Sequence, residues 1–275
     1  MSQTLATVPV LASSRRRTSP RLNWALPLRR VASPLFLLLV WQAASSAGLL
    51  SPRTLASPLQ IVAAGWDLAW SGDLAANVAV SLARVAAGLV IGVSIGSVLA
   101  ILAGLSRLGE DIIDAPMQML RTLPFLALVP LFILWLGIGE TPKVALVALG
   151  AAFPIYLNLF SGIRGIDPKL VEMARTFGLD RAGLVRHVIL PGALPAALTG
   201  LRFSLGVAWL SLVVAEQINA HSGIGYMIND ARDFLRTDVI MVGLVLYALL
   251  GLAVDGMVRA FERRLLAWRP SLVQA

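Results

Sequence analysis

The sequence contains no cysteine, only two histidines and only two lysines. The absence of cysteine excludes disulfide bridges and cysteine metal sites. Neither Lys143 nor Lys169 follows a glycine, so the glycine-rich loop with which many ATPases hold phosphate is missing. His187 and His221 lie far apart in the sequence, which argues against a shared metal or catalytic role. We therefore expect neither a metal nor a cofactor, and no ATP hydrolysis by this chain.

Charge is also scarce. Charged residues make up 14% of the 275 residues, hydrophobic residues make up 57%, and the mean hydropathy is +0.80. Long uncharged apolar runs recur along the chain, which is typical of membrane-spanning helices. The sequence thus predicts an all-α polytopic membrane protein. The net charge of +8 is better explained by basic loops on the cytoplasmic side than by binding of nucleic acid.

The N-terminal part divides into three segments. Residues 1–30 are polar and basic and predict a cytoplasmic tail. Residues 31–50 predict a first transmembrane helix. A cleaved signal peptide is the alternative, which we disfavour because the apolar run is long and further spans follow. Residues 51–74 predict an external loop with a short amphipathic helix, on which Trp66 and Trp70 share one face.

Five further spans are expected, near residues 85–105, 122–139, 144–163, 196–219 and 239–260, with a short loop over 106–115. In the first of these, Gly88, Gly92 and Gly96 recur every four residues, which favours close packing of another helix on one face. Simple tolerance of glycine in membranes is the alternative. Pro124 and Pro130 predict a kink or a break in the next span.

Six spans place both termini on the same side of the membrane. With the termini in the cytoplasm, only Arg53, Arg84, Lys143, Arg232 and Arg236 of the 23 basic residues lie outside. Arg121 then lies at a cytoplasmic helix end, and residues 261–275 form a cytoplasmic C-terminal tail. The opposite orientation would violate the positive-inside rule.

The predicted cytoplasmic loop at 164–195 is unusually long and structured. Asp167 and Pro168 are typical of a helix start, Gly178 of a left-handed helix end, and Asp180 of a second helix start. Leu170, Val171, Ala174 and Phe177 fall on one apolar stripe. Pro191 and Pro195 are expected to break the second helix before the next span. A plain connector needs only a few residues, so we interpret this loop as a docking element for a cytoplasmic partner.

The same loop resembles a known sequence signature. Glu172, Met173 and Ala174, then Gly178, then Val188, Ile189, Leu190 and Pro191, are spaced as in the Glu-Ala-Ala signature of permeases of ATP-binding-cassette (ABC) importers. Met173 and Val188 depart from the commoner alanine and isoleucine but stay apolar. The resemblance covers residues 75–260 and implies a type I ABC importer transmembrane domain. It also implies that Glu172, Met173, Ala174, Gly178, Leu190 and Pro191 couple the chain to an ATPase.

Three stretches indicate which group of ABC importer permeases the chain resembles. Residues 118–140, 222–240 and 265–270 look like those of permeases for aliphatic sulfonates, and taurine and nitrate permeases share parts of them. The resemblance implies import of a small organic anion across the inner membrane. The implied partners are two cytoplasmic ATP-binding subunits, a periplasmic substrate-binding protein and a second copy of the permease.

A few ionisable residues are further candidates. Arg84 and Glu216 fall toward the outer ends of their spans, and we hypothesise that they pair at an external gate. Arg121 faces either an anionic substrate in the path or the inner interface, and we favour the interface.

Two further pairings are expected from the helical spacing. Glu172 pairs either with a basic residue of the ATPase or with Arg175 in its own helix. Asp255 is expected to pair with Arg259 one turn on.

Two other classes of function each require features that can be sought in the sequence. A proton-coupled secondary carrier would use intramembrane carboxylates such as Glu216 and Asp255, but it needs no large cytoplasmic loop. A membrane-embedded enzyme would need a cluster of His, Asp and Glu within the spans, and the sequence has none.

Overall fold

The computed structural model describes residues 25–265, and this part of the chain is all-α. Its α-helices are α1 (Ala25–Ser46), α2 (Pro58–Ser71), α3 (Asp73–Leu105), α4 (Arg107–Arg121), α5 (Phe125–Leu136), α6 (Glu140–Arg164), α7 (Pro168–Thr176), α8 (Arg181–Leu184), α9 (Leu190–Asn219), α10 (Ile224–Asp233) and α11 (Thr237–Leu265). A π-helical segment, Val185–Ile189, joins α8 to α9.

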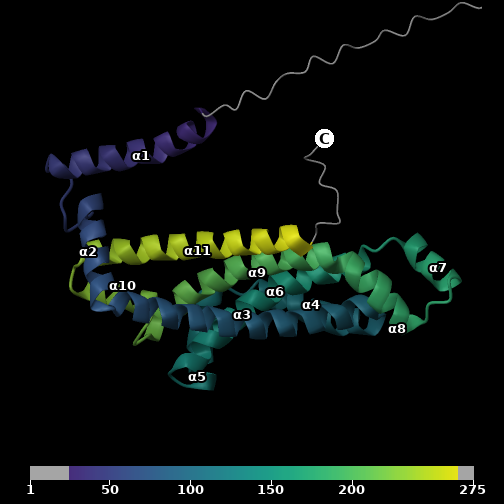
Figure 1. Cartoon of the computed structure of the whole chain (residues 1–275). Coiled ribbons are helices and arrows are strands. Elements are labelled where there is room, and N and C mark those ends of the chain that lie inside the picture. Colours follow the sequence, from purple (N-terminus) through teal and green to yellow (C-terminus); the bar gives the residue numbers. More distant parts are fainter. Residues whose placement is uncertain (1–24, 266–275) are drawn as a thin grey trace, which may run out of the picture.

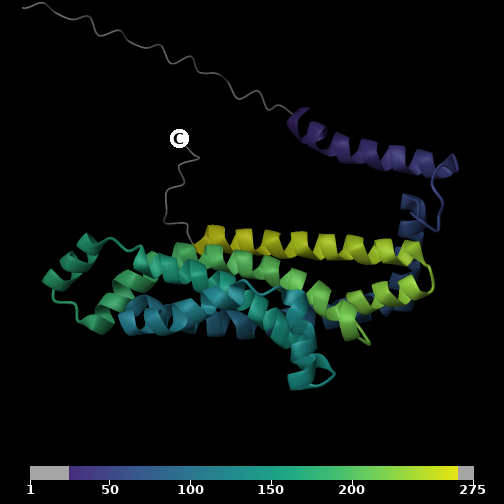
Figure 2. The same ribbon diagram turned by 180° about the vertical axis from the view of Figure 1, so that it is seen from behind.

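The long helices form a bundle in which α6 is central. α6 packs along α3 on one side and α9 on the other, and α11 lies beside α9 (Figure 1). α2 and α10 lie at one end of the bundle, and α7 and α8 project from the opposite end (Figures 1 and 2). α1 stands apart from the bundle and contacts α2. The two ends therefore carry different elements, and each holds one candidate site.

Four helical stretches of the described chain are long and apolar enough to cross a membrane. They are α3, α6, the continuous stretch Arg181–Ile218 and α11. The apolar parts of α1 and α5, at 32–46 and 127–136, are shorter. Together these segments correspond to the six predicted spans.

The glycine stripe of α3 packs against α6, as predicted. A Cβ added at Gly92 would lie 2.2 Å from the carbonyl oxygen of Ala148, and one at Gly96 would lie 2.4 Å from that of Ala152. At Gly88 the nearest atoms belong to Val147, at 2.6 Å. The two helices approach so closely that only glycine fits at these three positions.

The third span differs from the prediction. Residues 106–115 are not a loop, because Ser106 caps a helix that runs on to Arg121. The break predicted for the span 122–139 is confirmed at Pro124, where the chain leaves the helix at Thr122–Pro124 and resumes as α5, whereas Pro130 lies inside α5. Proline lacks the backbone N–H needed for the helix to continue through Pro124, which explains the break.

The segment 51–74 contains a short helix, as predicted. Ser57 and Gln60 form a capping box at the start of α2. Trp66 and Trp70 share one exposed face, and their rings stack at 6.5 Å between centroids. α3 begins at Asp73, well before the predicted start of its span. The predictions for most of the tail 1–30, for the last residues of the C-terminal tail 261–275 and for the stretch 265–270 lie outside the described residues.

Candidate functional site

The 164–195 loop forms a helical hairpin at one end of the bundle. α7 begins after Asp167, whose carboxylate accepts a backbone N–H bond at 2.9 Å, and Pro168 occupies the first turn. α8 begins after Asp180, whose carboxylate accepts a backbone N–H bond at 2.8 Å. Both predicted caps are confirmed, and they explain why this short segment folds locally.

Gly178 makes the turn between the two helices. Its φ is +84°, in the left-handed region. The Leu179 N–H donates to the Ala174 carbonyl at 3.1 Å, and the Gly178 N–H donates to the Arg175 carbonyl at 2.9 Å. This pair of bonds is the Schellman motif, so the predicted left-handed cap is confirmed. A Cβ on Gly178 would meet no atom within 4 Å, so any other residue is penalised through the backbone alone.

The hairpin presents apolar side chains away from the bundle. Leu170, Met173 and Phe177 are exposed, and Phe177 is 79% exposed. Ala174 alone of the stripe is buried. A connector folded onto the helix ends of its own chain would cover these side chains. Exposed apolar residues on a capped, projecting hairpin are instead typical of a surface that another protein covers.

Glu172 is also exposed on the hairpin. Within the described residues it forms no ion pair, so the alternative of a bond to Arg175 in the same helix is not observed. Its carboxylate is available to a partner.

The second half of the loop is continuous with the following span. α8 passes through the π-helical segment Val185–Ile189 directly into α9, so the predicted break at Pro191 and Pro195 is wrong. The Leu190 N–H bonds to the Val185 carbonyl, five residues back. Pro191 directly follows this π-helical segment, where the regular i→i−4 bonding is already interrupted. Leu190 and Pro191 thus lie inside one long helix that joins hairpin to bundle.

The opposite end of the bundle holds a buried ion pair. Arg84 of α3 donates from Nη1 to Oε1 of Glu216 of α9, at 2.6 Å. The side chain of Arg84 is 3% exposed, and that of Glu216 is fully buried. The hypothesised contact between these two residues is therefore present.

Glu216 is fully hydrogen-bonded in this position. Ser81 donates to it at 2.7 Å, the Gly225 N–H at 2.9 Å and the Tyr247 hydroxyl at 3.1 Å. All of these groups donate, which is the arrangement that an ionised carboxylate requires when buried. Four helices therefore meet at this one carboxylate: α3, α9, α10 and α11.

The segment before α10 closes over the pair. Arg84 donates to the Ser222 carbonyl at 2.7 Å and to its hydroxyl at 3.1 Å. Gly223 has a φ of +106°, and a Cβ there would lie 2.4 Å from Glu216 and 2.5 Å from Arg84. Only glycine allows the backbone to pass so close to the two charges.

Two further charges at this site were not singled out from the sequence. Glu140 accepts two hydrogen bonds from Arg84, one of them at 2.7 Å from Nη2, and Lys143 lies 3.1 Å from Glu140. We call Arg84, Glu140, Lys143 and Glu216 the four-charge cluster. The available signal was the pair Glu140 and Lys143 at the start of an otherwise uncharged run.

Arg121 lies away from the end of the bundle that carries the 164–195 loop, contrary to the prediction that places both on the same side. Asp114 of α4 bonds to the Tyr156 hydroxyl at 3.0 Å, and Glu110 pairs with Arg164 at the end of α6 that carries the loop. α4 therefore runs from the loop end back along α6. At 1.5 Å per residue, Arg121 on its last turn is about 21 Å from the start of the helix. It is exposed there, beside the break between α4 and α5.

Two remaining predictions concern polar groups on the helices. The pair of Asp255 and Arg259 is present at 2.7 Å, and Arg202 of α9 joins it at 3.0 Å. Arg202 lies 53 residues from Asp255 in the sequence, so no local sequence pattern predicts that it joins this ion pair. In the described part of the chain, no group of three or more His, Asp and Glu is placed to hold a metal ion.

A family model described as "Binding-protein-dependent transport system inner membrane component" matches residues 92–267. The chain is 51% identical over 253 residues to the "Putative aliphatic sulfonates transport permease protein SsuC" of Escherichia coli strain K12, covering 92% of this chain and 96% of that protein. The protein of the same description in Bacillus subtilis strain 168 is 44% identical, with coverage of 91% and 90%. The "Taurine transport system permease protein TauC" of E. coli is 36% identical, with coverage of 91% and 94%.

The fold has counterparts among solved structures. One is a chain of the MetNI methionine ABC transporter in an inward-facing conformation, with a TM-score of 0.53 and 22% identity over 66% of this chain and 92% of that one. Another is a chain of an amino acid ABC transporter, with a TM-score of 0.55 and 19% identity over 68% and 92%. At this level of identity, these likenesses establish the architecture alone.

Proposed function

We propose that this chain, which belongs to the family of binding-protein-dependent transport system inner membrane components, is the permease subunit of an ATP-driven importer for aliphatic sulfonates. It is a multi-pass membrane protein with the fold of an ABC importer transmembrane domain. ATP hydrolysis belongs to a separate subunit, since the relatives are permease proteins. The identity of 51% to a permease described for aliphatic sulfonates is the observation that supports this substrate best.

The hairpin at 164–195 is the docking element for the ATPase. Its exposed Leu170, Met173 and Phe177 supply an apolar surface, and the exposed Glu172 supplies a charge for a basic group of the partner. The small side chain of Ala174 lets the surface of the partner approach the hairpin closely. The symmetric oligomer typical of such assemblies would have two permease copies and two ATPase subunits, with a binding protein on the opposite face.

When the hairpin moves, the long helix from Arg181 to Asn219 transmits the displacement across the membrane. At 1.5 Å per residue, Glu216 lies about 52 Å from Arg181 along this helix. A displacement of the hairpin by the ATPase therefore reaches the four-charge cluster through one rigid element. In this proposal the pair of Arg84 and Glu216 is the external gate, because four helices meet there and would have to separate for it to open.

The membrane orientation follows from the same assignment. The hairpin and both termini lie in the cytoplasm, and α2 and α10 lie on the periplasmic face. Residues 75–260 are the transmembrane domain proper, and α1 lies outside it. Arg121, exposed on the last turn of α4 beside the break before α5, belongs to the path of the anion, since an intramembrane charge faces protein or water and not lipid.

The substrate is tested by growth. This chain is expressed with its own ATPase and binding protein in a bacterium that lacks sulfonate uptake, with an alkanesulfonate as sole sulfur source. We expect growth. Absence of growth with all proteins assembled would contradict sulfonate import. Growth on taurine instead would favour the second candidate substrate, which the 36% identity to the taurine permease supports.

The role of the hairpin turn is tested at Gly178. We expect Gly178→Val to abolish uptake, because a β-branched residue at φ +84° costs roughly 1–2 kcal/mol or more and displaces the turn. Copurification of the ATPase with the permease should be lost in parallel. Gly178→Asn is the matched control, since asparagine tolerates this conformation, and it should retain most of the uptake. Equal uptake by the Val and wild-type proteins would contradict the proposed role.

A further inference from the structure

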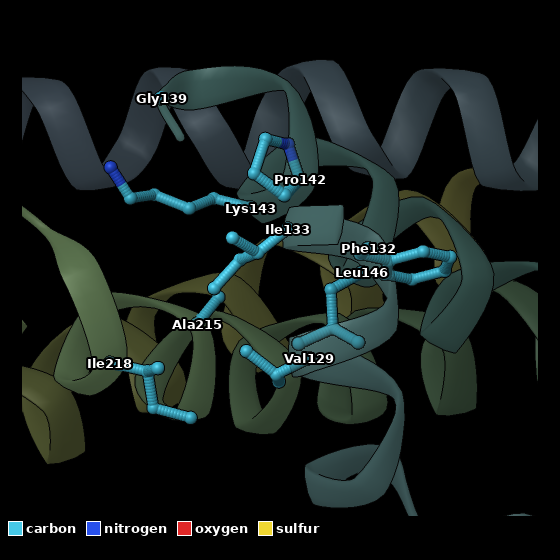
Figure 3. A pocket seen from close by; sticks show the side chains of 9 residues that line it. All are labelled: Val129, Phe132, Ile133, Gly139, Pro142, Lys143, Leu146, Ala215 and Ile218. Carbon is cyan, nitrogen blue, oxygen red and sulfur yellow. The ribbon is translucent and has the colours of Figure 1, made fainter. Parts of the chain in front are cut away.

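A cavity lies in the seam between α9 and α11, two helices that run side by side (Figures 1 and 2). Its volume is about 280 Å³. We call it the seam cavity, and its walls are mostly apolar side chains, namely Leu205, Trp209 and Leu210 of α9 and Val254 and Val258 of α11. By contrast, the recess beside Lys143, between α5, α6 and α9, has about 20 Å³ of free space, which is room for a single water molecule (Figure 3).

The seam cavity is narrow and is closed at one end. Trp209 closes it on the side of the four-charge cluster, where its Nε1 donates to the Tyr247 carbonyl at 3.1 Å and its ring meets the Tyr247 ring edge-on. Arg202 borders the other end, seven residues earlier and thus about 10 Å along the helix. An α-helix with its side chains is about 10–12 Å across, which is too wide for such a cavity. A single hydrocarbon chain is narrow enough to enter it, and the apolar walls suit it.

The open end of the seam cavity is charged. Arg202 and Arg259 both bond to Asp255, through one nitrogen each, at 3.0 and 2.7 Å. Two guanidinium groups share one carboxylate, so this group of three residues keeps one positive charge. The arginine side chains are 45% and 46% exposed, and each guanidinium has five N–H donors. Donors therefore remain for an anion that approaches from outside the bundle.

The charged end lies at the depth of a membrane boundary. Residues 203–215 of α9 and 239–254 of α11 carry no charge, so both helices become charged at the same level. Asp255 is about 27 Å from the first residue of α11, close to the thickness of about 30 Å of a hydrocarbon layer. Beyond it, α11 carries three arginines and one glutamate, namely Arg259, Glu262, Arg263 and Arg264. Phospholipid head groups lie at this level, on the side of the membrane that carries the 164–195 hairpin.

We propose that the seam cavity, with Arg202 and Arg259, is a binding site for an anionic phospholipid of the leaflet on the hairpin side. One acyl chain lies in the cavity and the phosphate contacts the two guanidinium groups. Basic pockets between transmembrane helices are known to take anionic head groups in this way. Free phosphate would leave the apolar walls unused, and a zwitterionic lipid would bring its own cation to a group that already has an excess of positive charge. The inference concerns lipid and does not depend on which anion is transported.

The head-group contact is tested by lipid binding to the purified full-length protein. Native mass spectrometry follows the titration of delipidated protein with phosphatidylglycerol, and with phosphatidylethanolamine for comparison. The wild type should bind phosphatidylglycerol more tightly. Arg202→Gln with Arg259→Gln should weaken that binding roughly thirtyfold, because each arginine near an anionic head group contributes about fivefold. Arg202→Lys with Arg259→Lys should retain most of the binding.

A matched control removes the same amount of charge elsewhere. Arg232 and Arg236 are exposed at the opposite end of the bundle, and Arg232→Gln with Arg236→Gln should leave phosphatidylglycerol binding unchanged. Equal binding by the wild type and the Arg202→Gln, Arg259→Gln protein would overturn the site. Equal affinity of the wild type for the two lipids would overturn it too.

The acyl-chain contact is tested by filling the seam cavity. Val254→Trp places a large side chain in its wall and should weaken phosphatidylglycerol binding at least tenfold. Leu252→Trp, on the same helix but 65% exposed and not among the residues of the cavity wall, should have no effect. If Val254→Trp instead separates the subunits of an oligomer and leaves lipid binding unchanged, the seam is a contact between proteins and the lipid site is wrong. Sulfonate uptake is measured separately, so each of these outcomes leaves the proposed function standing.

Discussion

Replacing Arg84 with alanine should abolish transport and destabilise the assembled protein by about 3–5 kcal/mol, the usual cost of removing one partner of a buried ion pair. Glu216 is fully buried and cannot reach water when its cation is removed. The remaining donors, Ser81, Tyr247 and the Gly225 N–H, carry no formal charge. Glu216→Ala should have a comparable effect, because it leaves the Arg84 guanidinium buried beside only one carboxylate.

The double variant Arg84→Ala with Glu216→Ala shows whether the two residues act as a pair or have independent roles. If the two residues act as a pair, the double variant is impaired less than either single variant, since no uncompensated charge stays buried. Glu140 is left without Arg84 in this variant, but it is exposed and keeps Lys143. Uptake rate and the melting temperature of the solubilised complex are both measured.

An exposed ion pair provides the control for this cycle. Arg232 and Asp233 lie 3.8 Å apart on α10 and are 68% and 73% exposed. Arg232→Ala should change stability by at most about 1 kcal/mol, as exposed pairs contribute little. Additive defects at Arg84 and Glu216 would contradict the gate, and so would an Arg84→Ala protein that transports normally.

Replacing Gly92 with alanine should prevent the helices α3 and α6 from packing. The added Cβ would lie 2.2 Å from the Ala148 carbonyl oxygen and 2.9 Å from the Ala151 side chain. Backbone atoms cannot rotate away as a flexible side chain can, so the helices must move apart. Overpacking of this kind costs typically 1–3 kcal/mol and occasionally more. α3 and α6 pack along much of their length, so we expect less assembled protein in the membrane and a lower melting temperature.

Gly206→Ala is the matched control for Gly92→Ala. Gly206 lies in the helical part of α9, where a Cβ would meet no atom within 4 Å. Alanine is also the better helix former, so this change should be neutral or slightly stabilising. If both alanine variants assemble and melt alike, the close approach of α3 and α6 is not what holds the bundle together.

The features predicted correctly from the sequence are local ones. The caps at Asp167 and Asp180, the turn at Gly178 and the glycine stripe of α3 each depend on residues within a few positions of one another. Capping and left-handed turns follow from short-range hydrogen bonding, and helical period follows from backbone geometry. The apolar runs likewise predicted a membrane protein, because lipid requires them.

The errors come from local patterns that have more than one outcome. Pro191 and Pro195 were expected to end a helix, but a π-helical segment before Pro191 lets the helix continue. The charged residues of 106–115 predict a loop, but Glu110 and Asp114 are paired with Arg164 and Tyr156 of α6. Charge on a segment indicates a loop only when no distant partner covers it.

By itself, the sequence determined the class of protein, the approximate places of its apolar helices and the caps and turn of the hairpin at 164–195, because hydrophobicity, capping and turn formation act over short distances. Tertiary structure alone decided which charges meet. Arg84 and Glu216 lie 132 residues apart, and the sequence indicated only that each would need a partner. Glu140 and Lys143 joined them through the rotation and packing of α3, α6 and α9. These depend on contacts between whole helices, which no local pattern encodes.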